Sequence, residues 1–309
     1  MLFRSLNYRK LKFKVLDKSQ NNNQDYFNKV RKILIDPQAR QISEDVKWVN
    51  LDDKWGIEKF PVVMAGDGDP ILLIHGFDSC FLEFRRIYPF LKKHFSIIIP
   101  DLLGFGFSPR KSESSYTPEN ILSSLEDLII KLSLKKKIKI VGASMGASVA
   151  LSLSNRIEKN IEKILLLSPA GIFEEPKSIP WPLNQIGASF LSLPLVRKNL
   201  CKQAFAYPEK SVGTKEEQIA SIHLGCSGWR NSLASFAKSG GFGGSYRCIR
   251  DIPIKTICGK NDRILGEKEL NKLKSFNKLN SVILNNCGHL PHLDLKDLTA
   301  KIIFDYFKK

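Results

Sequence analysis

The stretch KIKIVGASMGAS, residues 137–148, carries the strongest fold signal in the chain. Its first five residues predict a buried strand, and the small and apolar residues at 145–156 predict a helix directly after it. At the turn, Gly142 and Gly146 each stand two residues from Ser144, a G-x-S-x-G pattern. A serine on such a tight turn projects its hydroxyl from the sheet edge, and the glycines leave room for neighbouring backbone. The pattern therefore predicts a nucleophilic serine at a helix N-terminus, where backbone N–H groups can face an oxyanion.

Short apolar runs alternate with helical patterns on both sides of this stretch. The run ILLIHG at 71–76 is typical of a strand buried on both faces of a parallel sheet. Further strands are predicted at 47–52, 59–65, 96–102, 161–168, 252–258 and 280–284, and helices at 81–94, 118–132, 266–276 and 295–307. This alternation predicts an α/β fold with a mainly parallel sheet built from right-handed βαβ units.

The alternation stops at residues 174–250, which read as helices and loops with a glycine cluster at 239–244. We interpret 174–250 as a helical lid inserted between two strands of one sheet. Residues 1–43 are polar and basic, and we interpret them as a partly helical N-terminal extension. The predicted organisation is thus a 1–43 extension, an α/β core at 44–173 and 251–309, and the 174–250 lid.

A serine hydroxyl is a poor nucleophile at neutral pH and needs a base. The segment NNCGHLPHLD follows the last predicted strand and holds two of the five histidines. His289 comes directly after that strand and is the predicted base, whereas His292 is expected to pack, to cap or to line the site. A metal site at this H-x-x-H would need further ligands, and none stands nearby at suitable spacing. His75, in an earlier loop, is expected to shape a turn.

The base needs a carboxylate to hold its tautomer. The segment GKNDRIL follows the strand at 252–258, and Asp262 is its only acid. Asp251 precedes that strand and Asp294 follows the histidine, so Asp262 is the predicted partner of His289. A turn or helix-capping role is the alternative interpretation of this aspartate. For the oxyanion, the expected donors are the N–H groups of Phe77, in the segment HGFDS, and of Met145.

The segments HGF, DLLGFGFSPR, VGASMGAS, GKND and NCGHLPH, in this order, closely resemble the α/β-hydrolase superfamily over about residues 55–309. The resemblance implies an eight-stranded, mainly parallel sheet with helices on both faces, a mobile helical lid, no cofactor, and a triad of Ser144, Asp262 and His289. Many relatives have glycine where this chain has Ala147. Ser144, on the turn between strand and helix, argues against haloalkane dehalogenases and epoxide hydrolases, which carry aspartate at this position. HGFDSCFLEFRR and DLLGFGFS look most like a poorly characterised branch from photosynthetic cells and plastids.

The leading functional hypothesis is an ester hydrolase that forms an acyl-enzyme on Ser144. One alternative is a cofactor-free C–C or C–O lyase resembling the menaquinone-pathway synthase of this fold, with Arg230, Arg247 and Arg250 holding substrate carboxylates. Another is a non-catalytic protein that keeps the binding pocket. Ester turnover with a trapped acyl-enzyme separates the first hypothesis from the other two.

The amino-acid composition and net charge indicate which classes of partner this protein can bind. The chain has 309 residues and 43% hydrophobic residues, enough for a full core, and a net charge of +17. Much of the excess lies at residues 1–50 and 174–250, at +6 and +5. Such charge suits anionic partners, although a solvated lysine-rich surface is the simpler interpretation. No nucleic-acid-binding signature is present.

The large apolar residues at 180–196, between these basic segments, instead indicate a lipophilic substrate and weak peripheral contact with an anionic membrane. No apolar run reaches the ~18 residues that span a bilayer. The N-terminus lacks the apolar centre of a signal peptide, and six dispersed cysteines suit reduced thiols, so a cytoplasmic location is expected.

Overall fold

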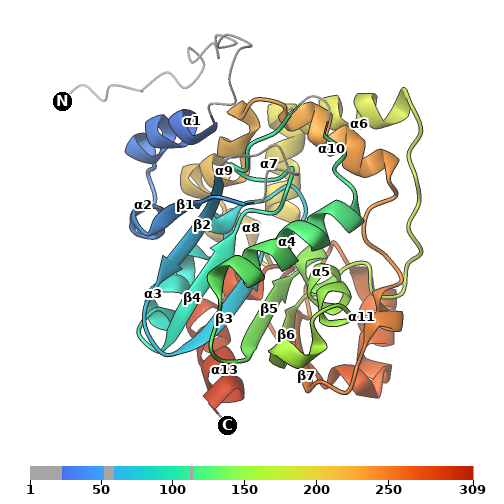
Figure 1. Cartoon of the computed structure of the whole chain (residues 1–309). Coiled ribbons are helices and arrows are strands. Elements are labelled where there is room, and N and C mark those ends of the chain that lie inside the picture. The colour runs from blue at the N-terminus through green and yellow to red at the C-terminus, as the bar shows by residue number, and fades with distance from the viewer. Residues whose placement is uncertain (1–22, 52–58, 112–113, 309) are drawn as a thin grey trace, which may run out of the picture.

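The computed structural model describes residues 23–51, 59–111 and 114–308. Within them, eight strands form one sheet in the order β1-β2-β4-β3-β5-β6-β7-β8 (Figure 1). The strands are β1 (Val46–Val49), β2 (Phe60–Ala65), β3 (Asp69–Ile74), β4 (Phe95–Pro100), β5 (Ile138–Ala143), β6 (Ile161–Leu167), β7 (Ile254–Gly259) and β8 (Ser281–Leu284). Strand β2 pairs antiparallel with β1 and β4, and all other pairs are parallel. The predicted fold class is confirmed.

The α-helices surround this sheet. They are α1 (Asn23–Val30), α2 (Pro37–Glu44), α3 (Tyr88–Leu91), α4 (Pro118–Leu132), α5 (Met145–Ser154), α6 (Leu183–Leu191), α7 (Pro194–Gln203), α8 (Pro208–Ser211), α9 (Thr214–Ser221), α10 (Trp229–Lys238), α11 (Gly266–Ser275), α12 (Pro291–Asp294) and α13 (Lys296–Lys308). Short 3₁₀ helices are η2 (Arg31–Ile33), η4 (Phe81–Arg86), η5 (Glu158–Asn160), η6 (Ile222–Gly225), η7 (Ser245–Cys248) and η8 (Asn277–Leu279). None of the described helices is long and apolar enough to cross a bilayer.

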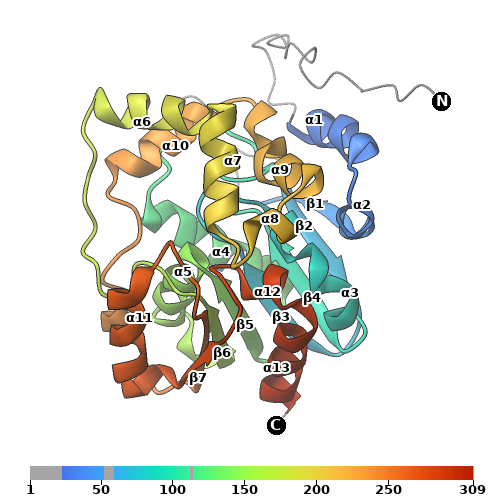
Figure 2. The same ribbon diagram turned by 180° about the vertical axis from the view of Figure 1, so that it is seen from behind.

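The two faces of the sheet are covered by different helices. Helices α4 and α5 stand in front of the sheet in Figure 1, and α3 and α13 in Figure 2. Along β3, Leu72 and Ile74 join the apolar cluster on the α4 and α5 side, and Ile71 and Leu73 join the cluster on the α13 side. Burial of both faces explains why this strand is continuously apolar.

One predicted helix is interrupted. The structure replaces the expected helix at 81–94 with η4 followed by the four-residue helix α3. Pro89 has no N–H to donate to the preceding turn, so it interrupts a continuous helix, but it is tolerated in the first turn of a new one. The helix therefore restarts at Tyr88.

The second half of the predicted N-terminal extension packs on the α/β core, and its first part, residues 1–22, lies outside the described residues. Phe27 and Ile42, from α1 and α2, are buried in the cluster on the α13 side. The ring of Phe27 lies 5.8 Å from that of Phe81. Asp36, before α2, forms a buried ion pair with Arg85 at 2.7 Å. Helices α1 and α2 therefore stabilise the core.

Residues 174–250, here named the insertion, lie between β6 and β7 in the sequence and contain α6–α10. These helices gather at one end of the sheet, away from the end of α13 (Figures 1 and 2). The carboxyl ends of parallel strands are where open α/β sheets carry their sites. The insertion contacts loops at that end, as described below.

Candidate active site

Ser144 occupies a strained turn between β5 and α5. Its backbone angles are φ 51° and ψ −119°, a conformation that side chains other than glycine rarely adopt. The neighbouring strand holds it in place, because the Ser144 N–H donates to the Leu167 carbonyl at 2.9 Å. The Ser144 carbonyl accepts from Ala147 and Ala170 at 3.0 and 3.2 Å. The turn leaves the serine side chain partly accessible to solvent.

The two flanking glycines are required by close backbone contacts. A Cβ at Gly142 would lie 2.4 Å from the Gly146 carbonyl oxygen. A Cβ at Gly146 would lie 2.2 Å from the carbonyl oxygen of Ile74, at the end of β3. Ala147, directly after the second glycine, is fully buried within α5. The turn therefore depends on the two glycines of the motif.

Replacing Gly146 with alanine should destabilise the protein by about 3 kcal/mol or more, because the added methyl has no room among backbone atoms that cannot move independently. Gly187→Ala is the matched control, since a Cβ at Gly187 in α6 meets no atom within 4 Å. This control should be neutral or slightly stabilising. Thermal denaturation followed by circular dichroism measures both. Equal unfolding temperatures for the two variants would contradict the steric argument.

The structure brings Ser144, His289 and Asp262 together from the loops after β5, β8 and β7. His289 Nε2 lies 2.8 Å from Ser144 Oγ, and His289 Nδ1 lies 2.8 Å from Asp262 Oδ2. The other carboxylate oxygen, Asp262 Oδ1, accepts from the Ile264 and Leu265 N–H groups, each at 2.9 Å. Both the imidazole and the carboxylate are buried. The three side chains form a chain of hydrogen bonds with one exposed end, at the serine.

Asp262 is ionised in this arrangement. Burial alone would raise the pKa of its carboxyl, but the hydrogen bond and charge of His289 and two backbone N–H groups outweigh burial, so the pKa lies below its usual value. A carboxylate at this position keeps the proton of neutral His289 on Nδ1. His289 Nε2 is then free to accept the proton of Ser144.

The loop that carries His289 is fixed by Asp294 and by the insertion. Asp294 Oδ2 accepts from the Gly288 N–H at 2.7 Å and from the Ala206 N–H at 2.9 Å. The His289 N–H donates to the Ala204 carbonyl of the insertion at 2.8 Å. Asp294 therefore acts on the backbone around the histidine, and its carboxylate makes no contact with the imidazole.

Residues 75–79 hold the expected oxyanion donor Phe77 and are here named the oxyanion loop. They lie against Ser144. A Cβ at Gly76 would lie 3.2 Å from Ser144 Cβ. Among the described residues, neither the Phe77 N–H nor the Met145 N–H donates to a protein acceptor. Two expected donors beside the serine are therefore available to a ligand oxygen.

Buried polar groups shape the oxyanion loop from the core. His75 Nε2 accepts from the Leu102 N–H at 3.0 Å, and Nδ1–H donates to the Gly76 carbonyl at 2.8 Å. Burial lowers the pKa of His75, and both of its nitrogens are occupied, so this histidine shapes a turn. The Gly76 N–H donates to Glu83 Oε2 at 3.1 Å. His292 lies 3.4 Å from Glu83 Oε1 and packs on the Phe84 ring, behind the loop.

Comparisons with known proteins agree with the fold described above. A family model described as the alpha/beta hydrolase fold matches residues 69–194. A relative from Arabidopsis thaliana, "Alpha/beta hydrolase domain-containing protein VTE7", is 28% identical over 80% of this chain and 76% of its own. Lipase 1 of Psychrobacter immobilis is 27% identical over 75% of each chain. The solved structure of a meta-cleavage product hydrolase from Pseudomonas fluorescens matches with TM-score 0.69 and 18% identity, over 85% of this chain and 97% of that one.

The chain has the α/β-hydrolase fold, and the family model matches its residues 69–194. It is an enzyme of the hydrolase class, and the predicted resemblance is confirmed. The plant relative agrees with the predicted similarity to a branch from photosynthetic cells.

The DLLGFGFSPR segment of this hydrolase is held in place by hydrogen bonds of its first and last residues. Asp101 accepts from the Phe81 and Phe107 N–H groups, both at 2.6 Å, and Arg110 donates to three carbonyls of the same segment. Burial raises the pKa of Asp101 to about 7.

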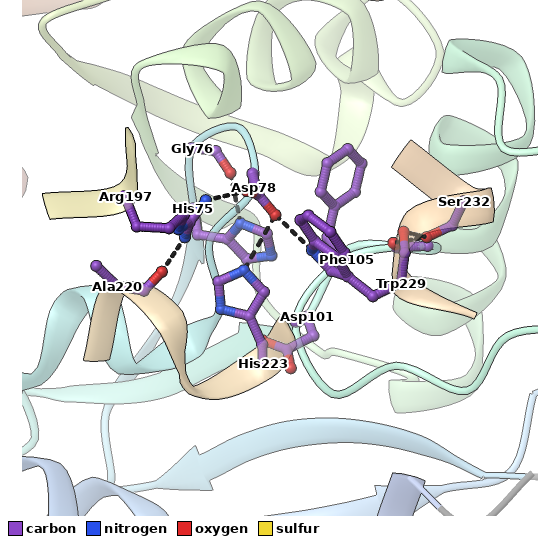
Figure 3. Close-up of polar contacts among 12 residues, drawn as sticks. His75, Gly76, Asp78, Asp101, Phe105, Arg197, Ala220, His223, Trp229 and Ser232 are labelled. Carbon is purple, nitrogen blue, oxygen red and sulfur yellow. Dashed lines mark hydrogen bonds and ion pairs between the residues drawn. The ribbon is translucent and has the colours of Figure 1, made fainter. Parts of the chain in front are cut away.

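The insertion of the hydrolase reaches the oxyanion loop through Asp78. This side chain is buried, and its backbone has a positive φ of 48°. Asp78 Oδ1 accepts from His223 Nε2 at 3.0 Å and from Trp229 Nε1 at 2.8 Å, and Oδ2 pairs with Arg197 Nη1 (Figure 3). Arg197 Nη2 also donates to the Ala220 carbonyl. Residues of η6, α10 and α7 thus converge on one carboxylate, which we name the Asp78 clamp.

Asp78 is ionised within this clamp. Burial alone would raise the pKa of its carboxyl, but hydrogen bonds from His223 and Trp229 and the charges of His223 and Arg197 hold that pKa below its usual value. Sequence patterns predicted neither Asp78 nor Glu83 as part of the site. Their only signal is an acidic residue within the otherwise mostly apolar segment from Gly76 to Phe84.

Aromatic rings cluster beside the oxyanion loop. The Phe77 ring is 44% exposed and lies 6.0 Å from the rings of both Phe105 and Phe236. Phe236 belongs to α10 of the insertion, and its ring lies 5.2 Å from that of Phe105 and 6.1 Å from that of Phe242. The oxyanion loop and the insertion therefore share one apolar wall.

The three arginines considered for binding substrate carboxylates lie at the surface of the insertion. Arg230, Arg247 and Arg250 are all exposed, and Arg247 pairs with Glu175 at the surface. Within the described ranges, no group of three or more His, Cys, Asp or Glu side chains is placed to hold a metal ion.

Proposed function

We propose that this hydrolase cleaves carboxylic esters through an acyl-enzyme on Ser144. The observation that carries the proposal is the pair of 2.8 Å contacts that join Asp262, His289 and Ser144. Ser144 Oγ attacks the ester carbonyl while His289 Nε2 takes its proton. The Phe77 and Met145 N–H groups stabilise the oxyanion. His289 then protonates the leaving alcohol, and a water molecule activated by the same histidine releases the acid.

The substrate that best suits the site has a lipophilic acyl or alcohol part. The wall of Phe77, Phe105 and Phe236 is apolar, and ligand pockets combine such walls with a few polar groups that orient the reacting bond. The relative from Psychrobacter immobilis, named a lipase, is consistent with this class.

A panel of p-nitrophenyl esters from acetate to laurate tests the proposal, together with labelling by a fluorophosphonate. We expect covalent labelling of Ser144 and a kcat/KM that rises from the shortest to the medium chains, because each buried CH₂ contributes about 0.8 kcal/mol. Labelling without any preference for longer chains would contradict the lipophilic substrate. Absence of labelling would contradict the acyl-enzyme itself.

The C–C or C–O lyase alternative would need cations for a dicarboxylate substrate. The three arginines expected to supply them are exposed, so the geometry supports ester hydrolysis better. Turnover of a cyclohexadiene dicarboxylate by elimination, without labelling by an ester substrate, would favour the lyase.

We also propose that the hydrolase acts in the cytoplasm and docks reversibly on anionic membranes through α6. Large apolar side chains around this helix point to solvent. From the sequence alone, they could also have formed the inner wall of a substrate pocket. They are Ile179, Trp181, Leu183, Ile186, Phe190, Leu193 and Leu195, with Trp181 75% exposed. Helix α6 lies at the outer edge of the molecule (Figures 1 and 2). An exposed apolar surface on an insertion with net charge +5 suits an anionic bilayer.

Flotation with vesicles of phosphatidylcholine and phosphatidylglycerol tests this docking. We expect binding in low salt and release in high salt, because each nearby Lys or Arg contributes ~1 kcal/mol and salt screens it. The double variant Trp181→Glu with Leu195→Glu should weaken binding at least about tenfold, since two charges would enter the interface. The matched control is Ile130→Glu with Leu298→Glu, two exposed apolar residues on α4 and α13. No binding in low salt, or equal loss in both variants, would contradict the proposal.

A further inference from the structure

We propose that Asp78 is a positioning residue, through which the insertion holds the Phe77 N–H in the geometry that the oxyanion requires. This inference rests on the proposed ester hydrolysis and adds a role for the insertion in the chemical step. The insertion would then contribute to the rate as well as to substrate binding.

The first argument is the place of Phe77 between two anchors. On one side, the Gly76 N–H is held by Glu83 of the core at 3.1 Å. On the other side, Asp78 is held by three side chains of the insertion. Phe77 has no other polar attachment among the described residues, because its N–H donates to no protein acceptor there. The direction of this N–H therefore depends on the two neighbouring anchors.

The second argument is the conformation of Asp78. Its φ of 48° lies in the left-handed region, which is unfavourable for a side chain other than glycine. Aspartate adopts this conformation more readily when its side chain bonds to local backbone, but here the carboxylate bonds to distant side chains. These are the Arg197, His223 and Trp229 side chains, and all three act on the Asp78 carboxylate (Figure 3).

The third argument is burial. Asp78 is 8% exposed and His223 is 1% exposed, so water cannot replace a lost partner without a change in the loop. A displacement of the insertion would leave an unpaired buried carboxylate one residue from the oxyanion donor. The oxyanion loop should therefore relax whenever α7, η6 or α10 moves away.

The alternative is that the clamp only fastens the insertion to the core. In that case its loss would lower stability or raise KM, because the apolar wall would be misplaced, and kcat would stay unchanged. A positioning role predicts the opposite division, with a lower kcat and a nearly constant KM. It also predicts slower phosphonylation of Ser144, since this reaction uses the same oxyanion donors.

Asp78→Gly removes the carboxylate of the clamp but permits the same backbone conformation, because glycine adopts a positive φ at no cost. We expect kcat for p-nitrophenyl butyrate to fall about 100-fold, the scale for a misplaced or lost oxyanion donor, with KM changed less than about threefold. The matched control is Glu216→Gln. Glu216 is also 8% exposed and also joins the insertion to the core, through Arg86 at 2.5 Å, but it lies on α9 and does not touch the oxyanion loop. This control should keep kcat within about threefold.

Trp229→Phe provides a milder variant in case Asp78→Gly does not fold. It keeps an aromatic ring in the clamp and removes one N–H donor, and we expect a drop of about fivefold in kcat and in the phosphonylation rate constant. A wild-type kcat in either folded variant would overturn the inference, as would a rise in KM alone.

Labelling of the wild-type enzyme distinguishes failure of the inference from failure of the proposed function. If a fluorophosphonate labels wild-type Ser144 and labels the Asp78→Gly variant at the same rate, the positioning role is wrong and ester hydrolysis stands. If wild-type Ser144 is not labelled, the proposed function is wrong and the inference is wrong with it.

Discussion

Replacing Ser144 with alanine should lower kcat for p-nitrophenyl esters by roughly 10⁶-fold and abolish labelling by fluorophosphonates. Ser144 Oγ is the atom that lies 2.8 Å from His289 Nε2, and the variant removes the attacking group itself. Stopped assays at high enzyme concentration measure the residual rate, and mass spectrometry of the labelled peptide locates the adduct. Covalent labelling of the alanine variant at another residue would contradict the assignment.

Two further variants separate chemistry from folding in this experiment. Ser154→Ala changes another serine of α5, whose hydroxyl donates to the Leu151 carbonyl at 2.7 Å, and it should keep full labelling. Ser144→Gly should be as inactive as Ser144→Ala but more stable than it by about 1 kcal/mol or more, because φ 51° with ψ −119° suits only glycine. Equal stabilities would mean that the turn stores no strain.

Replacing Asp262 with asparagine should lower kcat by about 10³–10⁴-fold while the protein stays folded. An amide in place of Oδ2 favours the wrong imidazole tautomer and cannot stabilise the protonated His289 that forms during attack. Asp251→Asn, an exposed aspartate before β7, is the matched control and should leave kcat unchanged. Steady-state kinetics with a p-nitrophenyl ester measures both. A loss smaller than about tenfold would show that a different acid orients the histidine.

The same carboxylate predicts a pH dependence of folding. The pKa of Asp262 is lowered in the folded protein, so its ionised form stabilises the fold at any pH above the unfolded value of about 4. This contribution is lost as the pH falls through the folded pKa. Wild-type protein should therefore lose more stability between about pH 5 and pH 2 than Asp262→Asn does. Urea denaturation across that range measures the difference, and parallel curves would contradict it.

Local sequence patterns predict the sheet, the turn at Ser144 and the order of Ser144, Asp262 and His289 along the chain. These features depend on local physics. Apolar runs predict buried strands, and Gly142 and Gly146 are set by backbone contacts within one strand-turn-helix unit and its neighbour. Asp262 and His289 follow predicted strands directly, so parallel topology alone brings them to the edge where Ser144 lies. The helix predicted at 81–94 overlooked the break at Pro89, which divides this segment into η4 and α3.

The contacts of the insertion and of the N-terminal helices with the core could not be predicted from local patterns. The Asp78 clamp joins residues separated by 119, 145 and 151 positions in the sequence, and no local pattern encodes such contacts. The apolar residues around α6 could equally have faced the site, because hydrophobicity alone does not say which side of an insertion meets solvent. Phe27 and Ile42 lie in helices of a mostly polar segment, and only their packing on the sheet shows that they belong to the core. In each case the deciding quantity is a contact between distant segments, whose free energy depends on the folded neighbours.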